Sequence, residues 1–420
     1  MSDNIKKFSN VLIVLFFLFL PFERLLTFEF FGLTAKISFF LLMILVLFFL
    51  AKLPRIKFAP EEKILLLFGA ISYLSAFWSI DFKRSLIIST IYLLVFFGFF
   101  ALRRQINEKN SEIIKLIVIY FGALLCLFAL WQYFADLYNL SAYTFLRPEY
   151  QKVVFGFPRP QATFLEPLYF ANFLLLPTFF TAERLLKDKK IYPFMVINLF
   201  LMMLVVVLTL SRGAYFAFAF AAIILAIFII VRFKEFIRRL WLTVFIVLLG
   251  IVAGVMLIYL TVPRQNFSLF VTHTGISDAA TGGSTLGRLY TSELALSQSL
   301  KYPLGIGAGA FGALPEFDNL YEKGIYQTVG SLYPEILVEE GVLGFLLFAA
   351  FIWLLLRHLW KSTASGKPVS STAERLEGLI YLAILLAILV QAVSFSSLYI
   401  LPIWAFFALA WPVPPTKLQI

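Results

Sequence analysis

The stretch VVVLTLSRGAYFAFAF, residues 205–220, decides the fold because it carries a single charged side chain in an otherwise apolar run. From Phe194 to Val231, Arg212 is the only strongly charged residue. This run of 38 residues is too long for one membrane crossing, since about 20 apolar residues span a bilayer as a helix. The Ser-Arg-Gly turn divides the run, so we predict two membrane-spanning helices that meet at Arg212.

The composition of the whole chain agrees with this prediction. Of the 420 residues, 61% are hydrophobic, 18% are aromatic and 14% are charged, whereas a soluble globular protein has an apolar share nearer one half. The apolar residues come in runs of about 17 to 24, the length of a transmembrane helix. The single cysteine, Cys126, lies inside such a run and excludes an internal disulfide or a cysteine metal cluster. We therefore predict an all-α polytopic membrane protein with one integral membrane domain, residues 1–420.

Twelve apolar segments predict about twelve transmembrane helices. They lie at roughly 8–21, 36–52, 63–79, 84–102, 112–135, 164–182, 192–210, 213–231, 239–262, 332–356, 376–394 and 397–413. The first segment follows two lysines like a secretory signal, but it lacks a small-residue cleavage site, so we interpret it as a retained span. The polar segment 357–375 is predicted to be a cytoplasmic loop.

Charge is sorted between the two sides of the membrane when the N-terminus is placed in the cytoplasm. The inner segments then hold 23 of the 35 Lys and Arg residues and 10 of the 24 acidic residues, a net charge of +13. The outer segments hold the other 12 basic and 14 acidic residues, a net charge of −2, and the two values sum to +11. This sorting follows the positive-inside rule. The excess positive charge orients the protein and contacts anionic membrane lipids, and it does not indicate nucleic-acid binding.

Two outer segments, 136–163 and 263–331, are much longer than the other loops. Loops of more than about 15 residues are usually functional or disordered. The second segment is the large extracytoplasmic loop between the ninth and tenth spans. Within it, apolar side chains recur near helical spacing, which predicts a short amphipathic helix on the outer membrane surface. These side chains are Leu286, Leu289, Tyr290, Leu294 and Leu300.

Three arginines on the outer side need individual explanations, because that side is not generally basic. Arg212 marks a turn between spans, where it either reaches to lipid phosphates or faces a water-filled substrate path. Arg159 lies between two prolines, which hold the local backbone extended. Arg288 adjoins the amphipathic helix, where an ordinary solvated charge is the alternative. Guanidinium groups bind phosphate bidentately and keep their charge, so convergence of the three arginines predicts a pyrophosphate site.

Candidate catalytic bases on the outer side are Glu166, Glu335 and His273. Glu166 follows Arg159 and precedes a proline, and Glu335 lies near the outer end of the tenth span. Either carboxylate can pair with an arginine or deprotonate an attacking hydroxyl, and spacing alone does not choose. His273 lies in the long loop, where a solvated bystander is the alternative. The chain has no HExxH motif, paired His/Asp cluster or cysteine ligand set, so a metal site or cofactor has no support.

The run GIGAGAFG, residues 305–312, superficially resembles a dinucleotide-binding loop. It lies on the predicted outer side and lacks the strand that precedes such loops. We interpret it as flexible, tightly turning backbone.

Four motifs in order along the chain resemble those of one family. They are RPQATFLEPLYFANF (159–173), TLSRGA (209–214), GRLYTSELALSQSLKYPLGIGAGAF (287–311) and GSLYPEILVEEGVLG (330–344). With the twelve spans and the long outer loop, they resemble the O-antigen ligase/O-antigen polymerase superfamily of bacterial membrane glycosyltransferases.

The resemblance implies a GT-C-like helical membrane fold and a defined reaction. Family members move a glycan from an undecaprenyl-pyrophosphate carrier to an acceptor on the outer side of the cytoplasmic membrane, without a nucleotide sugar or a metal. By motif position, Arg159, Arg212 and Arg288 would bind the donor pyrophosphate, which agrees with the interpretation of the same residues above. The expectation is therefore a metal-independent, inverting glycosyltransferase of the bacterial cytoplasmic membrane, with its active site facing the periplasm.

Gly330 departs from the ligase pattern. Ligases of the family carry a histidine here, shortly before a Glu-x-Gly motif, and glycine has no side chain that can act as a base. The resemblance therefore favours a surface polysaccharide polymerase, with an O-antigen ligase that transfers glycan to lipid A–core as the alternative. A transporter of anions or lipid-linked glycans is a more distant alternative, because the two halves of the chain show no matching interrupted helices.

Overall fold

The computed structural model of the protein describes residues 3–24, 27–30, 33–51, 57–140, 144–152, 156–274, 283–364, 372–396 and 398–411. These residues are helical almost throughout, which confirms the predicted all-α membrane fold. One short antiparallel hairpin was not predicted. It pairs β1 (Thr27–Phe30) with β2 (Leu33–Lys36), with Thr27 opposite Lys36.

Each of the twelve predicted spans falls on a helix. These helices are α1 (Asp3–Phe19), α2 (Ile37–Leu50), α3 (Pro60–Ser75), α4 (Phe82–Gln105), α5 (Glu108–Leu137), α7 (Pro167–Lys187), α8 (Pro193–Leu208), α9 (Arg212–Arg232), α10 (Ile237–Thr261), α15 (Leu332–Ala364), α16 (Thr372–Gln391) and α17 (Leu401–Ala410). In the described chain, six of them are long and apolar enough to cross a membrane, namely α4, α5, α9, α10, α15 and α16. The number of crossings therefore remains a prediction.

The helix starts follow from local sequence. Asp81 and Asn107 cap α4 and α5, because each side chain accepts a hydrogen bond from a main-chain N–H of the first turn, at 3.0 Å in both cases. Helices α3, α7, α8 and α17 begin with proline at the first or second position, where the missing N–H has no helical partner to lose. The predicted inner loop 357–375 is shorter than expected, because α15 continues to Ala364 and α16 begins at Thr372.

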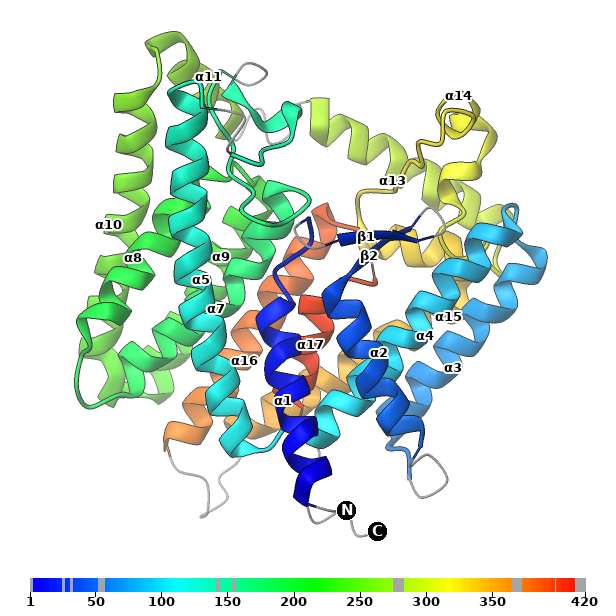
Figure 1. Ribbon diagram of the computed structural model, residues 1–420, viewed down its shortest axis with the longest axis horizontal. Helices are drawn as coiled ribbons and strands as arrows, with labels where there is room; N and C mark the ends of the chain where they lie inside the picture. The colour runs from blue at the N-terminus through cyan, green and yellow to red at the C-terminus, as the bar shows by residue number, and fades with distance from the viewer. Residues whose placement is uncertain are drawn as a thin grey trace.

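The long outer segment lies at one end of the bundle. In Figure 1, α11 (Arg264–Thr274), α13 (Gly283–Lys301), α14 (Asp318–Tyr321) and the β1–β2 hairpin gather at the end opposite the start of α1. Helix α13 is the predicted amphipathic helix. Its apolar side chains Leu286, Leu289, Tyr290 and Leu300 are exposed, whereas Leu294 packs against a small cluster of buried residues.

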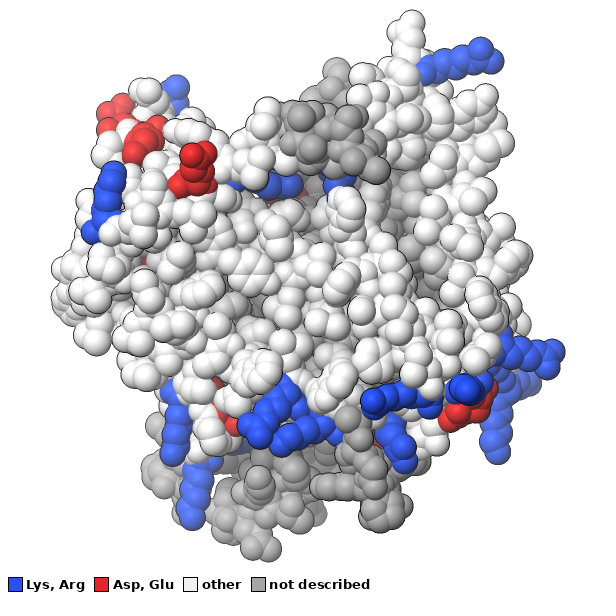
Figure 2. Space-filling model, turned by 180° about the vertical axis from the view of Figure 1, so that it is seen from behind, with Lys and Arg blue, Asp and Glu red and all other residues white. Residues whose placement is uncertain are grey.

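Charged side chains are unevenly distributed on the surface of the bundle. Figure 2 shows them in two zones of the face it displays, with a broad uncharged band between them. Lys and Arg dominate the zone at the end where α1 begins. A band of this kind is the surface that a bilayer covers. The distribution agrees with the basic inner side expected from the sequence.

The glycine-rich run after α13 packs against α15, backbone to backbone. Gly305 and Gly341 both have positive φ (86° and 72°), and a Cβ at Gly341 would lie 2.5 Å from the Pro303 carbonyl oxygen. The Glu339 carboxylate accepts hydrogen bonds from the Gly309 N–H (2.7 Å) and the Phe311 N–H (3.3 Å). The tight turns are confirmed, but the run is packed rather than flexible. This contact joins the third and fourth sequence motifs and fixes the end of α13 on the bundle.

Candidate functional site

The segment that carries Arg159 and Glu166 is held by the side chain of Gln132 on α5. The buried Gln132 amide donates to the carbonyls of Thr144 (2.9 Å) and Ala162 (3.0 Å). Its oxygen accepts from the main-chain N–H of Ala162 at 2.8 Å. Ala162 has a φ of 49°, a conformation that costs energy for a residue with a Cβ and that the surrounding contacts must hold. The backbone between the arginine and the glutamate is therefore fixed.

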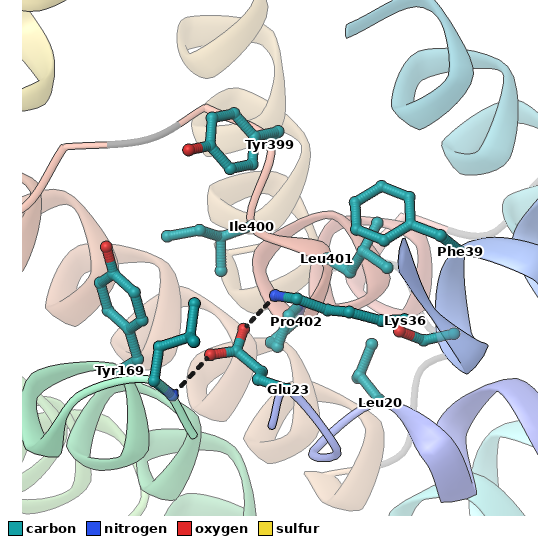
Figure 3. Close-up of a pocket in the computed structure, with 11 residues that line it drawn as sticks. Leu20, Glu23, Lys36, Phe39, Tyr169, Tyr399, Ile400, Leu401 and Pro402 are labelled. Atoms are coloured by element: carbon teal, nitrogen blue, oxygen red, sulfur yellow. Dashed lines mark hydrogen bonds and ion pairs between the residues drawn. The ribbon is translucent and has the colours of Figure 1, made fainter. Parts of the chain in front are cut away.

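Glu23, between α1 and β1, anchors the same segment from the other side. Its buried carboxylate accepts from Lys36 Nζ at 3.1 Å and from the Leu165 N–H at 3.2 Å, the two contacts drawn in Figure 3. A small cavity of about 60 Å³ lies beside this ion pair and reaches Tyr169 on α7. The position of Glu166, one residue beyond Leu165, therefore depends on contacts far away in the sequence.

The turn at Arg212 is bound to Arg159. Arg159 Nε donates to the Thr209 carbonyl at 3.2 Å, and its Nη2 lies 3.5 Å from the Leu210 carbonyl oxygen. Leu210 has a φ of 53°, which is unusual for a leucine. Strained backbone of this kind clusters at functional sites. Helix α9 begins directly after this turn with Arg212 as its first residue.

A cavity of about 290 Å³ is lined by Arg288 and Glu166, whereas Arg159 and Arg212 are not among its lining residues. Its walls come from the start of α7, from α13, from the segment before α15 and from the segment after α16. Most of the lining side chains are charged, hydroxyl-bearing or amide-bearing. The polar ones are Glu166, Tyr169, Ser284, Arg288, Thr291, Gln327, Thr328, Ser394 and Ser396. Such a lining suits a ligand that carries both negative charge and many hydroxyl groups.

The electrostatics show that the three predicted arginines lie near one another. Burial lowers the pKa of Arg159 and of Arg288, and the positive charge of Arg212 lowers both further. Glu166, the residue before α7, has a raised pKa because of its burial, although Arg147, Arg159 and Arg288 oppose this shift. The structure thus brings three arginines from separate segments together with one of the three predicted bases.

Neither of the other two candidate bases is among the described residues that line the cavity. Glu335 is buried in the first turn of α15 and is not among the residues that line the cavity. His273 lies in α11, and its side chain is outside the described residues.

Gly330 lines the cavity directly against Arg288. Its φ is 75°, and a Cβ at this position would lie 3.0 Å from Arg288 Cγ. The stem of Arg288 therefore occupies the space that a side chain at Gly330 would need. Gly213 likewise leaves room for a neighbouring side chain, because a Cβ there would overlap the hydroxyl of Ser394. Glycine at this position therefore lets the segment after α16 approach the start of α9.

Sequence reasoning missed two features of the site. Arg147 reaches the Leu165 carbonyl at 3.4 Å and acts on Glu166 electrostatically. Arg147 lies in the long outer segment 136–163. Considering every basic residue of that segment would have included it among the candidates. The hydroxyl-bearing wall had no such signal, because single Ser and Thr residues in loops are common.

Comparison with known families gives one match. Residues 197–349 match the family described as O-antigen ligase, a little over one third of the 420 residues. The matched region contains Arg212, Arg288 and Gly330, whereas Arg159 and Glu166 precede it. No curated protein matches the chain.

Proposed function

We propose that the chain, whose residues 197–349 match the family described as O-antigen ligase, transfers a glycan from undecaprenyl pyrophosphate to an acceptor glycan. We place this reaction at the outer face of the bacterial cytoplasmic membrane. The product in this proposal is a lengthened surface polysaccharide.

The observation that carries the proposal is that Arg288 lines the polar cavity, while the charge of Arg212 acts on both Arg288 and Arg159. The leaving group of the reaction is a lipid pyrophosphate, and fixed cations stabilise the charge that develops on it as the glycosidic bond breaks. Arginine suits this task because it binds phosphate oxygens bidentately and remains charged even where burial lowers its pKa. The hydroxyl and amide groups of the cavity wall suit the sugars on either side of the reacting bond.

The proposed chemistry is a single displacement at the sugar C1. A hydroxyl oxygen of the acceptor forms the new bond to C1, while the bond from C1 to the pyrophosphate oxygen breaks on the opposite face, so the configuration at C1 inverts. Glu166 takes the proton of the attacking hydroxyl, and undecaprenyl pyrophosphate leaves as the anion. The raised pKa of Glu166 supports this role, because a base with a pKa nearer neutrality accepts a proton more readily. Glu335 is the second candidate base.

Gly330 favours a polymerase over a ligase. The ligase pattern places a histidine at this position, and here the backbone φ of 75° and the adjacent Arg288 stem disfavour any side chain. The match to a family described as O-antigen ligase keeps transfer to lipid A–core as the second candidate.

One experiment separates these functions. Purified protein is incubated with an undecaprenyl-pyrophosphate-linked oligosaccharide, alone or with lipid A–core, and both released carrier and product length are measured. A polymerase produces a ladder of longer lipid-linked glycans from the donor alone. A ligase produces a single product that appears only with lipid A–core. Release of carrier with no lengthened or transferred glycan would contradict both.

A further inference from the structure

A third cavity lies at the opposite end of α7 from the arginine site. It encloses about 520 Å³ between α5, the end of α7 and the start of α8. Helix α7 has 21 residues, so the two cavities are roughly 30 Å apart along the bundle. The proposed topology places the cavity between α5, α7 and α8 at the inner surface of the membrane.

The cavity carries an excess of positive charge. Its charged lining side chains are Arg184, Asp188, Lys189 and Lys190. Arg184 is paired with Glu112 and, at 3.9 Å, with Asp188, so its charge is already balanced. Lys189 and Lys190 are exposed and form no ion pair with any described residue. Two ammonium groups at the mouth of the cavity are therefore available to an anion.

The turn that carries the two lysines is fixed in place. Arg239 on α10 donates to the Leu185 carbonyl at 3.1 Å and to the Lys189 carbonyl at 2.7 Å. These bonds hold the main chain and do not use the lysine ammonium groups. Lys189 and Lys190 therefore lie on a turn whose main chain is already fixed. Less conformational entropy of this turn is lost when an anion binds.

An exposed aromatic pair lines the cavity on the side of α5 and α8. The rings of Tyr120 on α5 and Phe194 on α8 are stacked, with centroids 4.8 Å apart and an interplanar angle of 26°. Both are exposed, by 51% and 37%, and Leu124 and Ile197 continue the same exposed apolar surface along the two helices. Aromatic side chains beside basic residues are typical of the membrane–water interface.

We propose that this cavity binds the headgroup of an anionic phospholipid of the inner leaflet. The phosphate contacts the ammonium groups of Lys189 and Lys190, and the acyl chains lie along the exposed apolar surface beside Tyr120 and Phe194. Basic pockets between transmembrane helices on the cytoplasmic side are known sites for anionic headgroups. A soluble anion fits less well, because it would leave the apolar side of the cavity uncovered. The site is separate from the proposed transfer reaction.

Native mass spectrometry of the purified full-length protein tests the proposal. Phosphatidylglycerol is the probe, phosphatidylcholine is the uncharged comparison, and soluble glycerol 3-phosphate tests for a free anion. We expect one retained phosphatidylglycerol and much weaker binding of the other two. The double variant Lys189→Gln/Lys190→Gln should weaken phosphatidylglycerol binding by roughly tenfold or more, since each lysine near an anionic lipid contributes on the order of fivefold.

The matched control is Lys63→Gln/Lys361→Gln, which removes two exposed lysines of the predicted inner side that do not line the cavity. It should bind phosphatidylglycerol as the wild type does. A second variant, Tyr120→Ala, should weaken lipid binding but leave the weak binding of glycerol 3-phosphate unchanged. The proposal is overturned if both double variants lose the lipid equally, if phosphatidylcholine binds as well, or if glycerol 3-phosphate competes fully. Glycan transfer by the same samples reports separately on the proposed function.

Discussion

Buried or half-buried basic residues occur at both ends of the bundle, and their surroundings differ. At the inner end, Lys115 is only 1% exposed and contacts Glu112 (3.2 Å), Glu183 (3.1 Å) and Glu377. Three carboxylates thus surround one ammonium group. At the outer end, Arg159 donates to the neutral carbonyls of Thr209 and Leu210.

This difference separates structural charges from charges that serve a ligand. Burial of an ion is costly unless opposite charge compensates for it. The inner cluster is compensated by its own carboxylates and links α5, α7 and α16. At the other end, the described arginines that act on one another or on Glu166 are Arg147, Arg159, Arg212 and Arg288, and the carboxylates that enter the same electrostatics are Glu149 and Glu166. An anionic ligand such as a pyrophosphate would complete that balance, so the two ends should respond differently to the loss of one cation.

The largest effect is expected at the inner cluster, on stability. Lys115→Met removes the nearer ammonium partner of the buried Glu183 and leaves only Lys187, at 3.8 Å, and breaking a buried ion pair in this way costs up to about 3–5 kcal/mol. Thermal unfolding of the purified variant in detergent should shift to clearly lower temperature. Transfer per folded molecule should stay near the wild-type rate. If Lys115→Met were as stable as the wild type but inactive in transfer, the inner cluster would serve the reaction and not stability, contrary to our assignment.

Arg288→Ala should reduce the transfer rate and leave the stability of the protein nearly unchanged. Removing one donor that stabilises a developing anion slows a reaction by about 10²–10³-fold, and Arg288 forms no ion pair with any described residue, so stability should change little. Released undecaprenyl pyrophosphate gives the rate, and thermal unfolding checks the fold. Lys301→Ala, at the exposed end of the same helix, is the control and should remain active.

Glu166→Gln should slow transfer by about 10²-fold, within the range of general-base catalysis. The carboxylate accepts a proton only when ionised, so the wild-type rate should rise with pH through the pKa of Glu166. Because burial raises that pKa, the rise should lie above the ordinary value of about 4.3. The variant should lack this pH dependence. If Glu335→Gln removes it instead, the base has been assigned to the wrong carboxylate.

Gly330→Ala should give the smallest of these effects. A Cβ at a φ of 75° costs about 1–2 kcal/mol and presses on Arg288 Cγ from 3.0 Å. We expect roughly a tenfold loss of transfer, since about 1.4 kcal/mol corresponds to a factor of ten. The loss should fall on the donor KM if Arg288 is displaced. If the Gly330→Ala variant had the same kcat and KM as the wild type, Arg288 would tolerate a methyl group beside it. Gly330 would then not shape the donor site.

The sequence predicted features that depend on local pattern. The length of the apolar runs placed all twelve spans on helices, and the isolation of Arg212 in such a run singled out the turn at the site. Features that depend on distant contacts were not predicted. The hydrogen bond from the Leu165 N–H to the Glu23 carboxylate joins residues 142 positions apart. The packing of Gly305 against α15 likewise requires the folded backbone.

The direct test of the central claim is the affinity of the protein for undecaprenyl pyrophosphate itself. Binding is measured for the wild type, for Arg288→Ala and for Lys115→Met, with each value corrected for the folded fraction. The outer arginines should hold the pyrophosphate, so Arg288→Ala should bind at least about tenfold more weakly. Lys115→Met should match the wild type. Equal affinity of the wild type and Arg288→Ala would contradict the account.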